Sequence, residues 1–159
     1  MPWQQHVADV ALEIDPADGG LWYRGVDIAV PRQSGKTTLL LPMFVWRAES
    51  SHLLGGRQRM LYTAQTGNDA RDKFTEDYVE DLAASRIMRG RYRVTNHQGR
   101  YRIRFRSGSV LSPVAPTGTT GHGKTLDVGA LDEAWAQKDN RVEDGWRPAR
   151  STRRNAQLL

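Results

Sequence analysis

The feature that most constrains this chain is an apolar run that passes through a glycine-containing turn into an apolar helical segment. Residues 25–30 suit a buried strand, and residues 36–49 suit a helix in which Pro42 removes a hydrogen bond. The turn between them ends in Ser-Gly, and Lys-Thr opens the helix. Backbone N–H groups and a helix N-terminus converge at such a turn, which favours an anion. The segment therefore predicts a phosphate-binding loop.

A second segment competes for this role. The pattern G-x-x-x-x-G-K-[ST] occurs to the letter at residues 118–125, whereas residues 30–37 have Val30 in place of the first glycine. A phosphate loop must follow a strand and open a helix. Residues 30–37 meet that condition, but residues 118–125 lead into an apolar run, 126–131, that suits a strand. We therefore assign the phosphates to residues 30–37 and interpret residues 118–125 as a loop near the site; an ordinary strand-to-helix turn is the alternative at 30–37.

Two acidic residues, Asp132 and Glu133, follow the apolar run 126–131. Alone, this pair would be read as a helix cap, but after a phosphate loop its order suits nucleotide hydrolysis. Asp132 would hold Mg²⁺ through its water shell, and Glu133 would polarise the attacking water. Arg32 is either a γ-phosphate contact or a solvated loop arginine. The residues predicted to contact ATP or Mg²⁺ are Arg32, Gln33, Ser34, Gly35, Lys36, Thr37 (also a Mg²⁺ ligand), Thr38, Asp132 (a Mg²⁺ ligand) and Glu133.

The other segments alternate between helix and strand, which predicts an α/β layer fold with a largely parallel sheet. Apolar residues recur about every four positions between residues 68 and 85, which predicts an amphipathic helix there. The solvent-exposed side of this helix is acidic. Arginine alternates with apolar or aromatic residues between residues 100 and 106, which predicts a strand. Together with a preceding strand at 92–97 and a turn at Gln98-Gly99, it would form an antiparallel hairpin. Further strands are expected at 59–64, 109–115 and 126–131, and a weak helical region is expected before Pro148.

Arginine dominates the basic residues: nineteen arginines stand beside four lysines, and the net charge is +5. Residues 86–106 contain eight arginines and no acid. The alternate positions 100, 102, 104 and 106 place four of them on one face of the hairpin. This stripe would make sequence-independent, salt-sensitive contacts to DNA phosphates, or it is a solvated face with arginine from GC-rich codon usage. The acidic side of helix 68–85 either is exposed to solvent or contacts the basic surface of a neighbouring subunit.

Composition excludes several classes of protein. There is no cysteine, so disulfides, thiolate metal sites and cysteine nucleophiles are ruled out. The four histidines lie far apart, so no structural metal is expected. The 159 residues, 38% hydrophobic and 26% charged, suit one soluble domain. No apolar run is long enough to span a membrane and no signal peptide is evident, so we expect a cytoplasmic protein.

These motifs resemble the ATPase domain of the large terminase subunit of tailed bacteriophages. The resemblance covers residues 31–37 (Pro-Arg-Gln-Ser-Gly-Lys-Thr), 62–66 (Tyr-Thr-Ala-Gln-Thr), 121–123 (Gly-His-Gly) and 131–135 (Leu-Asp-Glu-Ala-Trp). Terminase phosphate loops commonly lack the first glycine and contain an arginine, so the departure at residue 30 favours this family over kinases and small GTPases. The resemblance implies a RecA-like P-loop NTPase three-layer sandwich of the additional-strand, catalytic-glutamate class, with the hairpin as an antiparallel insertion.

The resemblance also implies function. It implies ATP hydrolysis coupled to translocation of double-stranded DNA in the host cytoplasm. The implied partners are the portal and the small terminase subunit, in a homo-oligomeric ring. Trp3-Gln4 resembles the adenine-contacting segment of that family, so Gln4 is a further predicted ATP contact; a tryptophan packed on the core is the alternative.

Two departures from the family bear on activity. Residues 155–159 resemble the start of the strand that carries the coupling motif, and no nuclease domain is found in 159 residues. We therefore expect a fragment that binds nucleotide, hydrolyses it poorly and does not cut DNA, with no assignable trans-acting arginine finger. Two alternatives remain: a helicase-like ATPase, although Ala134-Trp135 departs from common helicase boxes, and a remnant that binds nucleotide, DNA or partner subunits without turnover.

Overall fold

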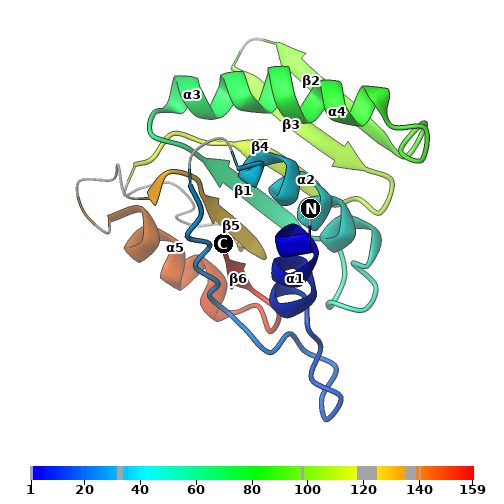
Figure 1. Ribbon diagram of the computed structural model, residues 1–159, viewed down its shortest axis with the longest axis vertical. Helices are drawn as coiled ribbons and strands as arrows, with labels where there is room; N and C mark the ends of the chain where they lie inside the picture. Colours follow the sequence, from blue (N-terminus) through cyan, green and yellow to red (C-terminus); the bar gives the residue numbers. More distant parts are fainter. Residues whose placement is uncertain (1, 32–33, 98, 118–124, 135–138, 140) are drawn as a thin grey trace.

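A single mixed sheet organises the chain, which we describe from a computed structural model covering residues 2–31, 34–97, 99–117, 125–134, 139 and 141–159 (Figure 1). The strand order is β2-β3-β4-β1-β5-β6. Strands β4, β1, β5 and β6 are mutually parallel, whereas β3 is antiparallel to both β2 and β4. The strands are β1 (Arg59–Thr63), β2 (Tyr92–His97), β3 (Arg100–Phe105), β4 (Val110–Pro113), β5 (Val128–Leu131) and β6 (Gln157–Leu158).

Helices cover both faces of this sheet, as Figure 1 shows. On one face lie α2 (Lys36–Glu49) and a continuous helical segment made of α3 (Gly67–Asp72), η1 (Lys73–Tyr78) and α4 (Val79–Ala84). Their apolar side chains form the main core with those of the strands; Phe44, Phe74, Tyr78 and Ile103 are each fully buried. On the other face α5 (Arg141–Ser151) buries Trp146 against β5. The predicted three-layer α/β sandwich is therefore confirmed.

The N-terminal helix α1 (Pro2–Ala11) was not predicted. It packs on α2 through a small cluster that includes Ala11, Leu39 and Met43. Trp3 is partly buried against the same cluster, so this side chain serves the core.

A buried arginine ties α2 to the sheet. Arg47 is fully buried and donates hydrogen bonds to Gln58 Oε1 at 2.8 Å, to the carbonyl of Asp127 at 3.1 Å and to that of Asn155 at 2.7 Å. Burial lowers the pKa of Arg47 to about 10, so the guanidinium stays charged at neutral pH. Because Arg47 contacts the start of β1, β5 and β6, it fixes the C-terminal half of α2 over the sheet.

The strand predicted at 25–30 is wrong in its extent. Gly25 forms only an isolated parallel bridge with Leu158, supported by the bonds Val26 N to Leu158 O and Leu158 N to Arg24 O, both 2.9 Å. Strand β6 is two residues long, so it pairs with residues 24–26 only. The chain that leads to the turn before α2 therefore lies beside β6, on the side away from β5.

Two helices also differ from the sequence prediction. The predicted helix 68–85 contains a π-helical turn at Lys73–Tyr78, where hydrogen bonds span five residues instead of four. Helix α5 continues past Pro148 to Ser151, because a proline near a helix end removes only one hydrogen bond. None of the described helices is long and apolar enough to cross a membrane.

Candidate functional site

The described end of the turn before α2 is a left-handed glycine at a helix N-terminus, which is a feature of anion sites. Gly35 is the N-cap of α2 and adopts the left-handed region, with φ 88° and ψ 28°, which favours glycine. It makes no side-chain cap hydrogen bond, so the first N–H groups of α2 are left for another acceptor. Ser34 Oγ donates to the carbonyl of Pro31 at 2.7 Å, and Gln4 Nε2 donates to that of Gly35 at 2.7 Å. Both bonds hold the turn in shape at the positive end of the helix dipole.

A buried carboxylate faces this turn from the end of β5. Asp132 is 2% exposed, and its Oδ1 lies 2.6 Å from Lys36 Nζ. Its Oδ2 accepts hydrogen bonds from Lys73 Nζ at 3.0 Å and from the Tyr62 hydroxyl at 2.9 Å. The backbone N–H of Glu133 donates to Oδ1 at 2.9 Å. Four elements, α2, η1, β1 and β5, thus converge on one carboxylate.

The charges of this cluster stabilise one another. Burial raises the pKa of Asp132, but hydrogen bonds from Lys36 and Lys73 outweigh burial and hold that pKa below its ordinary value. Burial lowers the pKa of Lys73, yet the Asp132 and Glu133 carboxylates raise it above its ordinary value overall. Burial also raises the pKa of Tyr62, so its hydroxyl remains a donor. At neutral pH Asp132 is ionised and Lys73 is protonated.

Glu133 has a backbone conformation that residues other than glycine rarely adopt. Its φ is 56°, and it is the one residue other than glycine with positive φ in the described part of the chain. Such strain costs about 1–3 kcal/mol and is found where the surrounding structure enforces it. Its Oε1 lies 3.6 Å from Lys73 Nζ, and its side chain is 32% exposed. Glu133 can therefore reach solvent while Lys73 holds it near Asp132.

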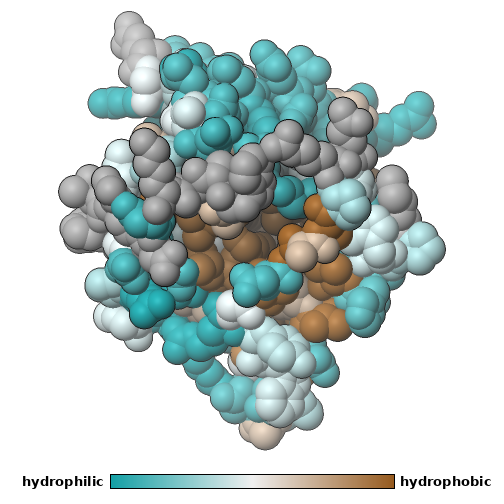
Figure 2. Space-filling model, turned by 60° about the vertical axis from the view of Figure 1, so that its left-hand side comes forward, coloured by the Kyte–Doolittle hydropathy of each residue, from teal (hydrophilic) through white to brown (hydrophobic). Residues whose placement is uncertain are grey.

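The loop and the acidic pair line one cleft of about 1190 Å³. Figure 2, which brings the left-hand side of Figure 1 forward, shows apolar side chains exposed in a hollow within a hydrophilic rim. Apolar residues of 26–30 line the cleft together with Leu131 and Leu159. A mixed lining of this kind suits a ligand with both an apolar and a charged part.

The donors suit a polyphosphate that carries its own divalent cation. No group of three His, Cys, Asp or Glu residues that could hold a metal occurs among the described residues. Mg²⁺ needs no such group, because one or two carboxylates, water and substrate phosphates complete its shell. Asp132 and the Thr37 hydroxyl, both in the cleft lining, are the candidate ligands.

The structure brings most of the predicted site residues together. Gly35, Lys36, Thr37, Thr38, Asp132 and Glu133 all line the cleft, and Ser34 and Gln4 support the turn. Arg32 and Gln33 lie outside the described residues, as does nearly all of the rival segment 118–125. Sequence reasoning missed Lys73 and Tyr62. A signal for Lys73 existed, since it is the one lysine in the predominantly acidic helix 68–85.

Comparison with known proteins supports the fold. No family model matches the sequence, and no curated protein matches it. The large terminase of a thermophilic bacteriophage in complex with ADP superposes with a TM-score of 0.71 at 19% identity. The HK97 bacteriophage large terminase gives 0.71 at 15%, and the thermophilic phage terminase in complex with ATP-γ-S gives 0.69 at 18%. Each match covers 98% of this chain and 36% of the terminase chain.

The chain thus spans about a third of the length of these terminases. It has the RecA-like fold of the matched part of these terminases, and the resemblance predicted from the motifs is confirmed at the level of the fold.

Proposed function

We propose that this chain is the ATP-binding and ATP-hydrolysing motor domain of a phage DNA-packaging terminase. One observation carries the proposal: Lys36, the first residue of α2, lies 2.6 Å from Asp132 at the end of β5. A phosphate-binding lysine and a metal-binding carboxylate must meet across a sheet edge for phosphoryl transfer. The fold shared with nucleotide-bound terminase structures supports the same reading.

Each site residue then has a role. Lys36 would bind the β- and γ-phosphate oxygens, and the N–H groups of residues 33–36 and α2 would surround the β-phosphate. Thr37 and Asp132 would hold Mg²⁺, which when bound neutralises charge on the phosphates. Glu133 would accept a proton from the attacking water. Thr38 and Arg32 would complete the phosphate contacts. Gln4, whose side-chain amide donates to the carbonyl of Gly35, would also contact the adenine.

Lys73 adds a role that the motifs do not carry. Its ammonium bonds Asp132 and lies near Glu133, so both carboxylates keep a partner when Lys36 turns to phosphate. Lys73 would thereby orient Glu133 and hold the Asp132 charge in place.

Double-stranded DNA, the portal and the small terminase subunit are the partners that this function requires, in a homo-oligomeric ring in the host cytoplasm. A helicase-like ATPase and a nucleotide-binding remnant are the alternatives. The full gene that encodes this chain would distinguish a terminase from a helicase. A nuclease domain with clustered acidic residues favours a terminase, and a second RecA-like domain favours a helicase.

Nucleotide binding by the purified chain tests the proposal. ATP with Mg²⁺ should raise the unfolding temperature, since ligand at a hundred times its Kd stabilises by about 2.7 kcal/mol. Glu133→Gln should keep this shift and lose phosphate release by about 10²–10⁴-fold. A parent without phosphate release above Glu133→Gln would leave only the remnant.

Two lysine variants test the choice of loop. Lys36→Ala should abolish the ATP-induced shift, whereas Lys124→Ala should behave as the parent. The reverse result would move the phosphates to residues 118–125 and refute the assignment.

A further inference from the structure

One face of the β2–β3 hairpin carries only polar and basic side chains. In the β2–β3 register Arg93 stands opposite Arg104, Thr95 opposite Arg102 and His97 opposite Arg100, and directly opposed residues share a face. The intervening residues Ile103 and Phe105 are buried under the helices on the other face.

The same row continues across the sheet. Val110 on β4 pairs with Arg104 on one side and with Arg59 on the other, so Arg59 joins this face. We call these five residues the arginine face: Arg59, Arg93, Arg100, Arg102 and Arg104.

None of the side chains of the arginine face makes an ion pair within the described residues, and no acid occurs between residues 86 and 106. One carboxylate, Asp127, lies beside Arg59, but it accepts a hydrogen bond from the backbone N–H of Arg59 and pairs with Arg153. Like charges directly opposed on neighbouring strands destabilise a sheet. The Arg93–Arg104 pair is therefore an unfavourable contact, and no carboxylate of the described residues pairs with either side chain.

Five arginines elsewhere in the described chain pair with carboxylates: Arg71, Arg91, Arg147, Arg153 and Arg154. Arg91 pairs with Glu49 at 2.9 Å, and Arg153 pairs with Asp127 at 2.6 Å. Codon usage would add arginine everywhere alike, so it does not account for unpaired arginines gathered on one sheet face. A local arrangement that costs stability is expected where function requires it.

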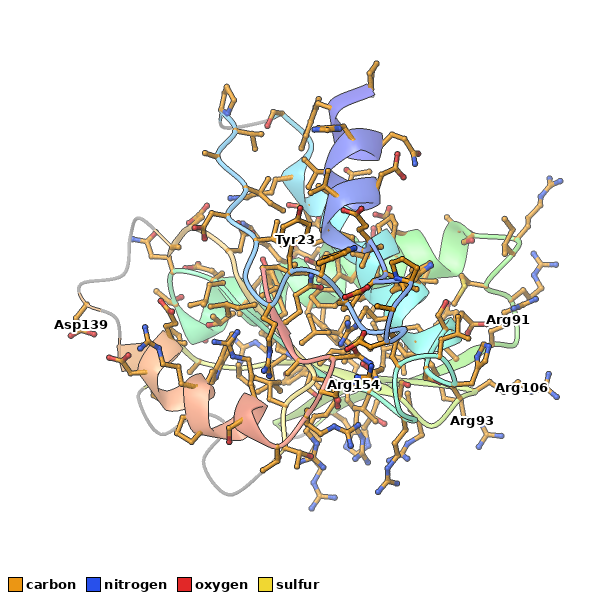
Figure 3. The ribbon with its side chains drawn as sticks, turned by 90° about the horizontal axis from the view of Figure 1, so that it is seen from below. Tyr23, Arg91, Arg93, Arg106, Asp139 and Arg154 are labelled. Carbon is orange, nitrogen blue, oxygen red and sulfur yellow. The ribbon has the colours of Figure 1, made fainter. Side chains whose placement is uncertain are left out.

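The arginine face is open to a large partner. The helices α3 and α4 cover the opposite side of the hairpin, and Trp146 of α5 packs against β5 rather than β2 or β3. Arg93, Arg100 and Arg104 are exposed. Figure 3 shows Arg93 and Arg106, the latter just after β3, reaching away from the ribbon.

We propose that the arginine face binds the sugar–phosphate backbone of double-stranded DNA without regard to sequence. The partner's identity rests on the proposed function, and the surface rests on the register and the charges. Guanidinium groups match phosphate oxygens with two parallel hydrogen bonds, and alternate residues on a strand repeat at about 6.8 Å. A basic stripe along one face is the electrostatic footprint of a nucleic-acid site, so we commit to DNA as the partner.

A salt titration of DNA binding tests the surface. The full chain is titrated with two short duplexes of unrelated sequence between about 50 and 200 mM salt, by fluorescence anisotropy. For B-DNA the slope of log K against log salt is about −0.9 per phosphate neutralised. Arg93→Gln/Arg104→Gln should weaken binding of both duplexes equally and reduce the slope by about 1.8, whereas Arg93→Lys/Arg104→Lys should keep it.

A second double variant supplies the matched control. Arg147→Gln/Arg154→Gln removes the same charge from exposed arginines that pair with acids, and should leave the slope close to that of the parent. Equal losses in both double variants, or no DNA binding by the parent, would overturn the proposal.

A second copy of this chain is the alternative partner of the arginine face, and a measurement of self-association tests it. The acidic outer side of α3 and α4 on a second copy would also attract arginine. If Arg93→Gln/Arg104→Gln dissociates an oligomer while DNA binding is unchanged, the face is a subunit contact and the proposal fails. ATP binding of each variant is measured separately, so a failure of the nucleotide site is distinguished from a failure of this surface.

Discussion

Asp132 concentrates more interactions than any other acidic side chain described above. Two ammonium groups, a phenol and a backbone N–H converge on its two oxygens. Motif order predicts Lys36, Asp132 and Glu133, because these residues must lie at fixed places relative to a strand and a helix. It could not predict Lys73 or Tyr62, since their contacts arise only when separate elements pack together.

Acid should destabilise the parent through Asp132, and Lys73 should control how strongly. The pKa of Asp132 in the folded chain lies below its ordinary value, so its contribution is present above about pH 4 and is lost as pH falls through the folded pKa. Lys73→Met removes one cause of the lowered pKa. We expect this variant to be less stable at neutral pH and to lose less stability between about pH 4 and pH 2.

Urea unfolding at a series of pH values measures this effect. Lys73→Arg, which keeps the charge, should follow the parent. If the unfolding free energy of Lys73→Met fell as steeply with acid as that of the parent, Lys73 would not act on Asp132.

At the scale of elements, strands and helices were predictable where one periodicity ran for long enough. Helix α2 begins and ends where the sequence indicated, and the hairpin alternates arginine with buried Ile103 and Phe105. The strand at 25–30 was overestimated because its apolar run has only the two-residue β6 beside it. The π-helical turn at Lys73 leaves no mark in the apolar pattern, because Phe74 and Tyr78 stay on the buried side.

The packing of α5 on β5 depends on a glycine. A Cβ at Gly129 would stand 2.3 Å from Trp146 Cε3, a distance that no relaxed side chain tolerates. Gly129→Ala should therefore push Trp146 and α5 outward and cost about 1–3 kcal/mol of unfolding free energy. Urea unfolding followed by circular dichroism measures the loss.

Gly25→Ala is the matched control for this change. A Cβ at Gly25 meets no atom within 4 Å, so its unfolding midpoint should stay near that of the parent. If the two variants were equally stable, the close approach of Trp146 to β5 would not exist in solution.

At the scale of the whole molecule, the two ends of the described chain are joined beside the cleft that Lys36 and Asp132 line. Gln157 is fully buried and donates hydrogen bonds to the carbonyls of Ala11 at 2.6 Å and Tyr23 at 3.0 Å. Leu158 and Leu159 complete the sheet next to residues 24–26. Local patterns cannot reveal such contacts, because the partners are more than 130 residues apart.

Removal of the Gln157 amide should loosen this junction. Gln157→Ala leaves the buried carbonyl of Ala11 without its donor and should cost about 1–3 kcal/mol in unfolding free energy, with weaker ATP binding. Gln5→Ala, which loses only an exposed bond to Asp9, should match the parent in both measurements. Equal behaviour of the two variants would mean that the N-terminal segment is held in place without Gln157.

The bridge between Gly25 and Leu158 has a consequence for biosynthesis. A ribosome delivers the turn around Gly35 early, yet the residues that dock its approach to the sheet are delivered more than a hundred peptide bonds later. A nascent chain can form α2 and the hairpin as they emerge, but residues 24–26 dock on the sheet only once Leu158 has left the exit tunnel.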